Sequence, residues 1–215
     1  MTLLYLVRHG ETDWNLQRRI QGSTDIPLND TGRLQAARTG ALLARRRWDG
    51  ILSSPLSRAY ETAGIIADQT GLPGPEAFEE IVERAYGDAE GLTDAELSER
   101  FPPGSTVPGR ESREQVAARV IPALVRLGEG YPGKRLIVTT HGGVIRTVLN
   151  TVAPGSPAHR GIPITNGSIH SFRLSSGALE LVEFDDPIED ASVEPGAPDL
   201  SEQNAIEQRE AAGEG

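Results

Sequence analysis

The chain of 215 residues contains no cysteine and one methionine, and aromatic residues make up only 5% of it. The absence of cysteine excludes disulfides, thiolate metal ligands and cysteine nucleophiles. A long hydrophobic run is also missing, because Arg8 and His9 interrupt the first apolar stretch after five residues, 3–7. We therefore expect neither a signal peptide nor a membrane span, and we expect a cytoplasmic protein.

Basic residues are scarce at one end of the chain. The net charge is -10, and residues 185–215 contain ten acidic residues and one basic residue. The remainder is therefore close to neutral and has no basic face, so neither nucleic acid nor a membrane is an expected partner. The length suits one α/β domain, which we place at 1–184. Because large apolar side chains are almost absent from 185–215, we expect this acidic C-terminal tail to be disordered.

Hydrophobic periodicity predicts strands that alternate with helices. Strands are expected at 3–7, 51–53, 77–82 and 136–140, and a closing hairpin at 168–174 and 178–184. Helices are expected at 30–48, from 55 to about 70, at 93–101, from 112 onward and from about 144. This order predicts an α/β fold, a three-layer α/β/α sandwich on a mainly parallel sheet.

Three helices carry more specific expectations. The helix at 30–48 should bury the stripe Leu34, Ala37, Ala41, Leu42 and Ala44. Ser54 is expected to cap the following helix, with Pro55 at its first position. Pro122 is expected to kink the helix that begins at Ser112.

Polar side chains follow the predicted strands where each one ends. These residues are Arg8, His9, Arg58, Glu83 and His141. Because the carboxyl ends of parallel strands share one edge of a sheet, we expect the five side chains to converge there. Arginine forks match phosphoryl oxygens, a neutral histidine can attack phosphorus while its other nitrogen is held by a hydrogen bond, and a glutamate can transfer protons. The sequence therefore predicts a site for a phosphate ester.

The motifs around these residues resemble those of the histidine phosphatase superfamily, the phosphoglycerate mutase-like proteins. Residues 8–12, followed by Trp14-Asn15 and Gln21-Gly22, resemble the family signature. Residues 53–59 and 140–146 resemble the segments that carry the second arginine and the second histidine, and 83–91 resembles the acid motif. The match runs in order from about residue 3 to residue 174. It departs at Ala89, where many members carry an aromatic residue.

The resemblance implies a phosphatase that hydrolyses a small phosphate monoester through a phosphohistidine at His9, with Glu83 as proton donor. A nearby backbone carbonyl would hold the other nitrogen of His9, while Arg8, Arg58 and a cationic His141 would bind the phosphoryl group. Further substrate contacts are expected from Asn15, Gln21, Gly22 and Gly142. Because no clustered carboxylates accompany the histidine motif, we expect no metal and no other cofactor. The expected partner is a small phosphorylated metabolite.

Two alternatives remain open. A 2,3-bisphosphoglycerate-dependent phosphoglycerate mutase would use the same pocket, although only 57 residues separate Glu83 from His141, where mutases carry a longer insertion. A non-catalytic phosphate-binding module would keep the pocket without the reaction. Segments 20–26, 100–112 and 153–165 are expected to line the pocket, with His159 at its rim and His170 in a structural role. The resemblance also makes a homodimer possible.

Overall fold

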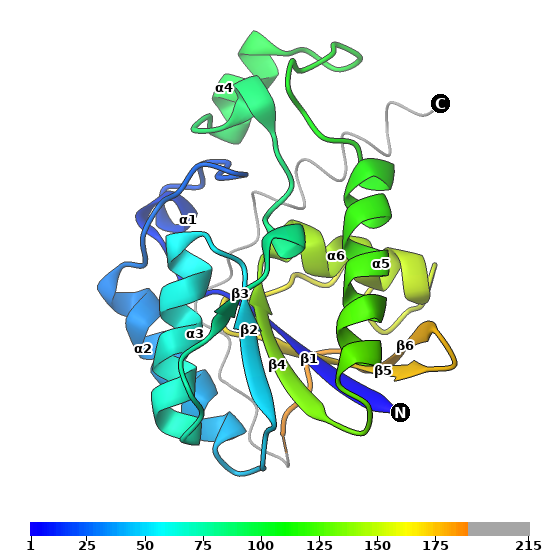
Figure 1. Cartoon of the computed structure of the whole chain (residues 1–215). Coiled ribbons are helices and arrows are strands. Elements are labelled where there is room, and N and C mark those ends of the chain that lie inside the picture. The colour runs from blue at the N-terminus through cyan, green and yellow to red at the C-terminus, as the bar shows by residue number, and fades with distance from the viewer. Residues whose placement is uncertain (189–215) are drawn as a thin grey trace.

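The computed structural model describes residues 1–188, which build a six-stranded sheet with helices on both faces (Figure 1). The strand order is β3-β2-β4-β1-β5-β6. The first four of these strands pair in parallel, whereas β5 is antiparallel to β1 and β6 is antiparallel to β5. The fold is therefore the predicted α/β sandwich. The strands are β1 (Thr2–Arg8), β2 (Gly50–Ser53), β3 (Glu76–Ala77), β4 (Arg135–Thr140), β5 (Ile169–Ser175) and β6 (Ala178–Glu183).

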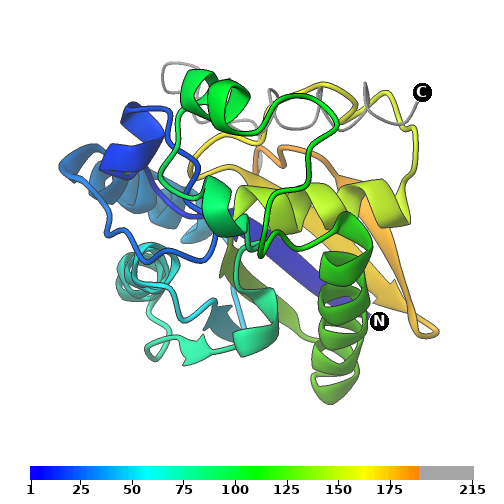
Figure 2. The ribbon, with the colours of Figure 1, turned by 90° about the horizontal axis from the view of Figure 1, so that it is seen from above.

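The helices separate into two layers and a cap. Helices α2 and α3 cover one face of the sheet, α5 and α6 cover the other, and α4 lies beyond the carboxyl ends of the parallel strands (Figures 1 and 2). The α-helices are α1 (Asp13–Leu16), α2 (Asp30–Leu43), α3 (Ser57–Thr70), α4 (Asp94–Arg100), α5 (Arg113–Gly130) and α6 (Gly142–Val152). Two short 3₁₀ turns are η1 (Glu79–Ile81) and η2 (Gly87–Ala89).

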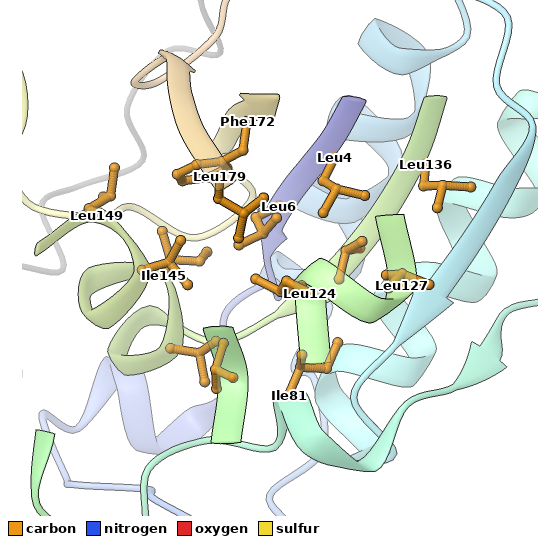
Figure 3. Close-up of a cluster of buried hydrophobic side chains, with 14 of the residues drawn as sticks. Leu4, Leu6, Ile81, Leu124, Leu127, Leu136, Ile145, Leu149, Phe172 and Leu179 are labelled. Atoms are coloured by element: carbon orange, nitrogen blue, oxygen red, sulfur yellow. The ribbon is translucent and has the colours of Figure 1, made fainter. Parts of the chain in front are cut away.

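Strand β1 supplies both halves of the core because successive side chains of a strand point to opposite faces. Leu4 and Leu6 pack in the larger cluster with residues of α5 and α6 (Figure 3). Tyr5 and Val7 pack in the other cluster, against α2 and α3. The apolar run that looked like one buried strand in the sequence is thus buried on both faces, as expected in a sheet with helices on each side.

The predicted stripe on α2 is wrong except at Leu42, because Leu34, Ala41 and Ala44 are exposed and Ala37 is only half-buried. Leu34 is 62% exposed, whereas the residues of α2 that are buried include Ala36, Gly40 and Leu43. At Gly40 the helix lies close to α3, because a Cβ there would lie 3.0 Å from the Cβ of Gln69. Two helices approach closely through small residues, which hydrophobic periodicity does not detect. The helix also ends at Leu43 rather than near residue 48.

The strand expected at 77–82 is also wrong, because β3 contains only two residues and a 3₁₀ turn follows it. The carbonyls of this segment are satisfied by side chains from elsewhere in the fold. Arg119 Nη1 donates to the Glu80 carbonyl at 2.7 Å, and Thr140 Oγ1 donates to the Ile81 carbonyl at 2.8 Å. These hydrogen bonds hold the residues before Glu83 in place, although β3 does not continue to them.

The predicted cap of α3 is wrong, whereas the predicted kink of α5 at Pro122 stays a prediction. Helix α3 begins at Ser57 after the N-cap Leu56, so Ser54 is not its cap, and Asp25 Oδ1 instead accepts the Ser57 backbone N–H at 2.8 Å. Helix α5 continues through Pro122 to Gly130. Pro122 and Ala118 are both exposed, so the Ala118 carbonyl that proline leaves without a helical partner lies on the solvent side of α5.

Residues 185–188, which the sequence assigns to the tail, lie against the domain. The Asp186 backbone N–H donates to the Ile169 carbonyl at 2.7 Å, and Ile188 is fully buried in the cluster beneath α2 and α3. The rest of the predicted acidic tail, 189–215, lies outside the described residues. Within residues 1–188, no helix is long and apolar enough to cross a membrane.

Replacing Leu6 by alanine should lower the free energy of unfolding by about 2–5 kcal/mol, because it leaves a cavity in the core. The matched change Leu34→Ala should stay within about 0.5 kcal/mol, since Leu34 is mostly exposed. Urea unfolding of the two variants measures both values. A large loss for Leu34→Ala would show that α2 is packed differently from the arrangement described.

Candidate active site

His9 follows β1 and is 3% exposed. Its Nδ1 lies 2.6 Å from the carbonyl oxygen of Gly10. A carbonyl only accepts hydrogen bonds, so Nδ1 carries the proton and Nε2 keeps a lone pair. The residue is further fixed by its backbone, because Asn166 Nδ2 donates to the His9 carbonyl at 2.9 Å. The expected contact between His9 and a nearby backbone carbonyl is therefore present.

Gly10 is required at its position by the packing of α2. A Cβ on Gly10 would lie 2.2 Å from the backbone oxygen of Gly32, in the first turn of that helix. The Gly10 N–H donates to Thr62 Oγ1 at 3.1 Å, and Thr62 donates to the Arg58 carbonyl at 2.7 Å. The segment that carries His9 is thus linked directly to the helix that carries Arg58.

Arg8 and Arg58 are both buried, at 4% and 0% exposure. Arg58 Nη1 and Nη2 donate to the carbonyls of Thr24 and Gly22, at 2.8 and 2.7 Å. Arg8 Nη1 donates to the Ile164 carbonyl at 2.6 Å. Each arginine is therefore oriented by a loop that the sequence expected at the pocket, 20–26 or 153–165.

The charges of these two arginines act on the histidines. Burial lowers the pKa of His9 well below its usual value near 6.5, and the positive charges of Arg58 and Arg8 lower it further, against the opposing hydrogen bond to Gly10. His9 is therefore neutral at pH 7, as a nucleophile must be. The positive charge of the guanidinium groups suits the binding of a phosphoryl group.

His141 follows β4 and is fully buried. Its ring centroid lies 5.2 Å from that of His9, and its Nε2 lies 2.7 Å from Ser54 Oγ. Burial lowers the pKa of His141 well below its usual value, and the charges of Arg58, His9 and Arg8 lower it further. The imidazole is therefore neutral at pH 7 in the site without a bound anion, and the cationic His141 expected against a phosphoryl group stays a prediction.

Glu83 lies at the first turn of α6, which begins directly after His141. Its Oε2 accepts the Gly143 N–H at 3.0 Å, and its Oε1 accepts the Val144 N–H at 3.1 Å and the Arg84 N–H at 2.8 Å. Helix α6 has no side-chain cap of its own, and Glu83 supplies one from a distant segment. Gly143 permits this contact, because a Cβ there would lie 2.6 Å from Glu83 Oε1.

The four expected substrate contacts lie around this group. Asn15 and Gln21 are buried and both accept from Thr12, whose Oγ1 donates to Gln21 Oε1 at 2.9 Å and whose N–H donates to Asn15 Oδ1 at 3.1 Å. Gly22 adopts a φ of +56° and presents its carbonyl to Arg58. Gly142 is the first residue of α6, next to His141. The structure thus brings all nine predicted site residues to one edge of the sheet.

Glu90 also supports the site, although the sequence analysis included it only as part of the motif 83–91. Its carboxylate accepts hydrogen bonds from the N–H and hydroxyl groups of Ser23 and Thr24 and from the Tyr86 N–H. Burial acts to raise the pKa of Glu90, but these hydrogen bonds lower it overall. Glu90 therefore holds the loop whose carbonyls orient Arg58. Its partners in that loop, Ser23 and Thr24, lie more than 60 residues away in the chain, so no local pattern reveals the contact.

The other two histidines lie outside the group. His170 is fully buried, accepts the Asp185 N–H at Nδ1 and bonds Ser168 Oγ through Nε2, and burial lowers its pKa to about 3. His159 packs near Phe184 and bonds the Ala153 carbonyl through Nε2. Within residues 1–188, no three histidine, aspartate or glutamate side chains are grouped as ligands for a metal ion.

Comparison with known proteins identifies related chains. Residues 4–187 match the family model described as the histidine phosphatase superfamily (branch 1). The chain is 40% identical over 184 residues to the uncharacterized phosphatase PhoE of Bacillus subtilis, covering 86% of this chain and 89% of that protein. It is 32% identical over 192 residues to a 2,3-bisphosphoglycerate-dependent phosphoglycerate mutase of Cytophaga hutchinsonii, with coverages of 82% and 89%.

A solved structure shows the same similarity in three dimensions. The chain resembles a mycobacterial glucosyl-3-phosphoglycerate phosphatase in complex with VO3, with a TM-score of 0.76 and 29% identity. The similarity covers 85% of this chain and 98% of that one.

The three buried histidines with lowered pKa values, His9, His141 and His170, should make stability depend on pH. Below pH 6.5 the unfolded chain binds protons that the folded chain does not, so stability is complete above pH 6.5 and is lost as the pH falls. Each histidine contributes up to about 1.4 kcal/mol per pH unit in that range. Urea unfolding between pH 7.5 and 5.5 should show the decline, and His170→Gln should make it shallower. A free energy of unfolding that is constant over this interval would contradict the assignment.

Proposed function

The chain belongs to the histidine phosphatase superfamily, and on this basis we propose that it hydrolyses a small phosphate monoester through a phosphohistidine at His9. The observation that carries the proposal is the neutral His9 imidazole, with Nδ1 held by the Gly10 carbonyl and with two buried arginines whose charges act on it. This arrangement leaves Nε2 as a nucleophile in a positive environment. Such an environment attracts a phosphate ester and does not protonate the attacking nitrogen.

In the first step, His9 Nε2 attacks phosphorus and the bond between phosphorus and the ester oxygen breaks. Glu83 gives its proton to the departing oxygen, so the alcohol leaves neutral. Arg8, Arg58 and His141 donate to the phosphoryl oxygens, where negative charge accumulates in the transition state. The proton stays on His9 Nδ1, which donates it to the Gly10 carbonyl in a hydrogen bond that stabilises the phosphorylated ring.

In the second step, water attacks the phosphohistidine. Glu83, now a carboxylate, takes the proton from water, and the bond between phosphorus and Nε2 breaks. Inorganic phosphate leaves and both residues return to their initial states. The positive charge in these steps comes from side chains of the protein, and we propose that no metal or other cofactor takes part.

Asn15, Gln21, Gly22 and Gly142 are proposed to contact the substrate. Gly22 and Gly142 adjoin Arg58 and His141, and Asn15 and Gln21 are linked to each other through Thr12. Because 20–26 and 153–165 also orient the two arginines, they set the outline of the space available to the ester. The proposed substrate is therefore a small phosphorylated metabolite, with sugar phosphates, phosphoglycerate derivatives, phosphoserine and cobalamin-precursor phosphates as the classes to test.

A phosphoglycerate mutase is the second candidate, and the similarity to a mutase of Cytophaga hutchinsonii favours it. The first half-reaction would be the same, but the phosphoryl group would return to the substrate rather than to water. The 57 residues between Glu83 and His141 leave little chain to cover the site and exclude water. We therefore favour hydrolysis. A non-catalytic phosphate-binding module is the weaker third candidate, because all five residues with chemical roles are present.

Phosphate release from a panel of monoesters in EDTA should be observed with the wild-type protein and be lost with His9→Ala. His170→Gln, which removes a buried histidine outside the site, serves as the matched control. Circular dichroism checks that this variant is folded, and it should retain activity. Including 3-phosphoglycerate with 2,3-bisphosphoglycerate detects isomerisation. Conversion to 2-phosphoglycerate without release would establish the mutase, and release that persists in His9→Ala would refute the proposed nucleophile.

Replacing Glu83 by glutamine should affect esters according to their leaving groups. An alkyl phosphate needs a proton on its departing oxygen, so kcat/KM should fall by about 10²–10⁴-fold. 4-Nitrophenyl phosphate loses a stable phenolate and should be affected much less in its first step. Glu79 is an exposed neighbour of Glu83, and Glu79→Gln should leave kcat/KM for both esters unchanged. Equal losses for both esters would indicate that Glu83 acts only by capping α6.

A further inference from the structure

Ser54 and His141 form a buried pair whose purpose the sequence does not reveal. Both residues are fully buried, and Ser54 Oγ lies 2.7 Å from His141 Nε2. The other contact of this hydroxyl is with the Leu56 backbone N–H, which donates to it at 3.4 Å. The hydroxyl oxygen is therefore already an acceptor. Within residues 1–188, the remaining acceptor for its own proton is His141 Nε2.

The direction of the bond follows from counting donors and acceptors. If Ser54 donates to Nε2, the hydroxyl proton and the Nε2 lone pair are both satisfied. The opposite direction would leave the hydroxyl proton buried without an acceptor, which is unfavourable. Since His141 is neutral at pH 7, its single ring proton then resides on Nδ1. In the part of the chain that the structure describes, that buried Nδ1 has no hydrogen-bond partner.

We propose that Ser54 is a positioning residue that fixes His141 in the tautomer protonated at Nδ1, so that His141 offers the phosphoryl group a neutral N–H donor. The inference rests on the proposed function for the identity of the ligand, but not for the tautomer. A neutral donor suits this pocket before an anion binds, because a third cation beside Arg8 and Arg58 would then be costly to bury.

The remaining histidines supply an internal comparison. His170 Nδ1 accepts the Asp185 N–H, so its proton is on Nε2, from which it donates to Ser168 Oγ at 2.9 Å. The protein therefore contains two buried serine–histidine pairs with opposite bond directions. In one the serine donates and frees Nδ1–H for a ligand; in the other the histidine donates and no N–H remains. Ser168 is thus the matched control for Ser54.

Long-range proton–nitrogen spectra of the imidazoles in the ¹⁵N-labelled protein at pH 7 test the tautomers directly. His141 is expected to be neutral and protonated at Nδ1, and His170 to be neutral and protonated at Nε2, with the signals assigned by His141→Gln and His170→Gln. A wild-type His141 that is protonated at Nε2, or at both nitrogens, would overturn the proposal. This measurement needs no variant of Ser54 and does not depend on catalysis.

The Ser54→Ala variant tests whether the Ser54 hydroxyl fixes the tautomer of His141 and thereby supports phosphate binding. Its His141 should lose the preference for Nδ1–H, and its inhibition constant for inorganic phosphate should rise about fivefold, as expected for the loss of one hydrogen bond of ordinary strength. Ser168→Ala should leave the tautomer of His141 and the inhibition constant for phosphate unchanged. Unaltered His141 signals and phosphate affinity in Ser54→Ala would overturn the proposal. A protein with the expected tautomers that binds phosphate but hydrolyses no ester would refute the proposed function and leave this inference standing.

Discussion

The burial of two guanidinium groups beside two imidazoles is the constraint on which the site depends. Arg8 and Arg58 are almost completely removed from water, and their charges reach both His9 and His141. The same positive field has two consequences, because it attracts a phosphoryl group and keeps the neighbouring imidazoles uncharged. A more exposed pocket would weaken both effects through screening by water. Burial therefore makes one arrangement serve binding and nucleophilic attack together.

The fold holds this charge in place through bonds that cross long stretches of chain. Gly22 and Thr24 present carbonyls to Arg58, and Glu90 holds the loop that contains them. Glu83 is fixed by the first turn of α6, where glycine leaves room for its carboxylate. Arg58 and Glu83 are thus held by backbone groups from separate elements. Unfolding any one of these elements would release charges that the others cannot pair.

The sequence predicts the site better than it predicts the elements that support it. Strands β1 and β4 end at the residues directly before His9 and His141, so strand patterns alone place both histidines at one edge of the sheet. Ser54 illustrates the limit: its local context indicates a helix cap, but its partner in the fold is 87 residues away. Leu34 illustrates another, because α2 packs through small residues such as Gly40. Contacts of this kind depend on three-dimensional packing that no local periodicity records.

The most direct test of this account is the position of the phosphoryl group during turnover. The wild-type protein would be mixed with its best ester, quenched within milliseconds in alkali, in which phosphohistidine is stable, and mapped by peptide mass spectrometry with analysis of the phosphohistidine isomer. The account predicts phosphate on His9 at Nε2, because Nδ1 is occupied by the Gly10 carbonyl. Phosphate on Nδ1 of His9, on another residue, or on no residue while the ester is consumed would contradict it.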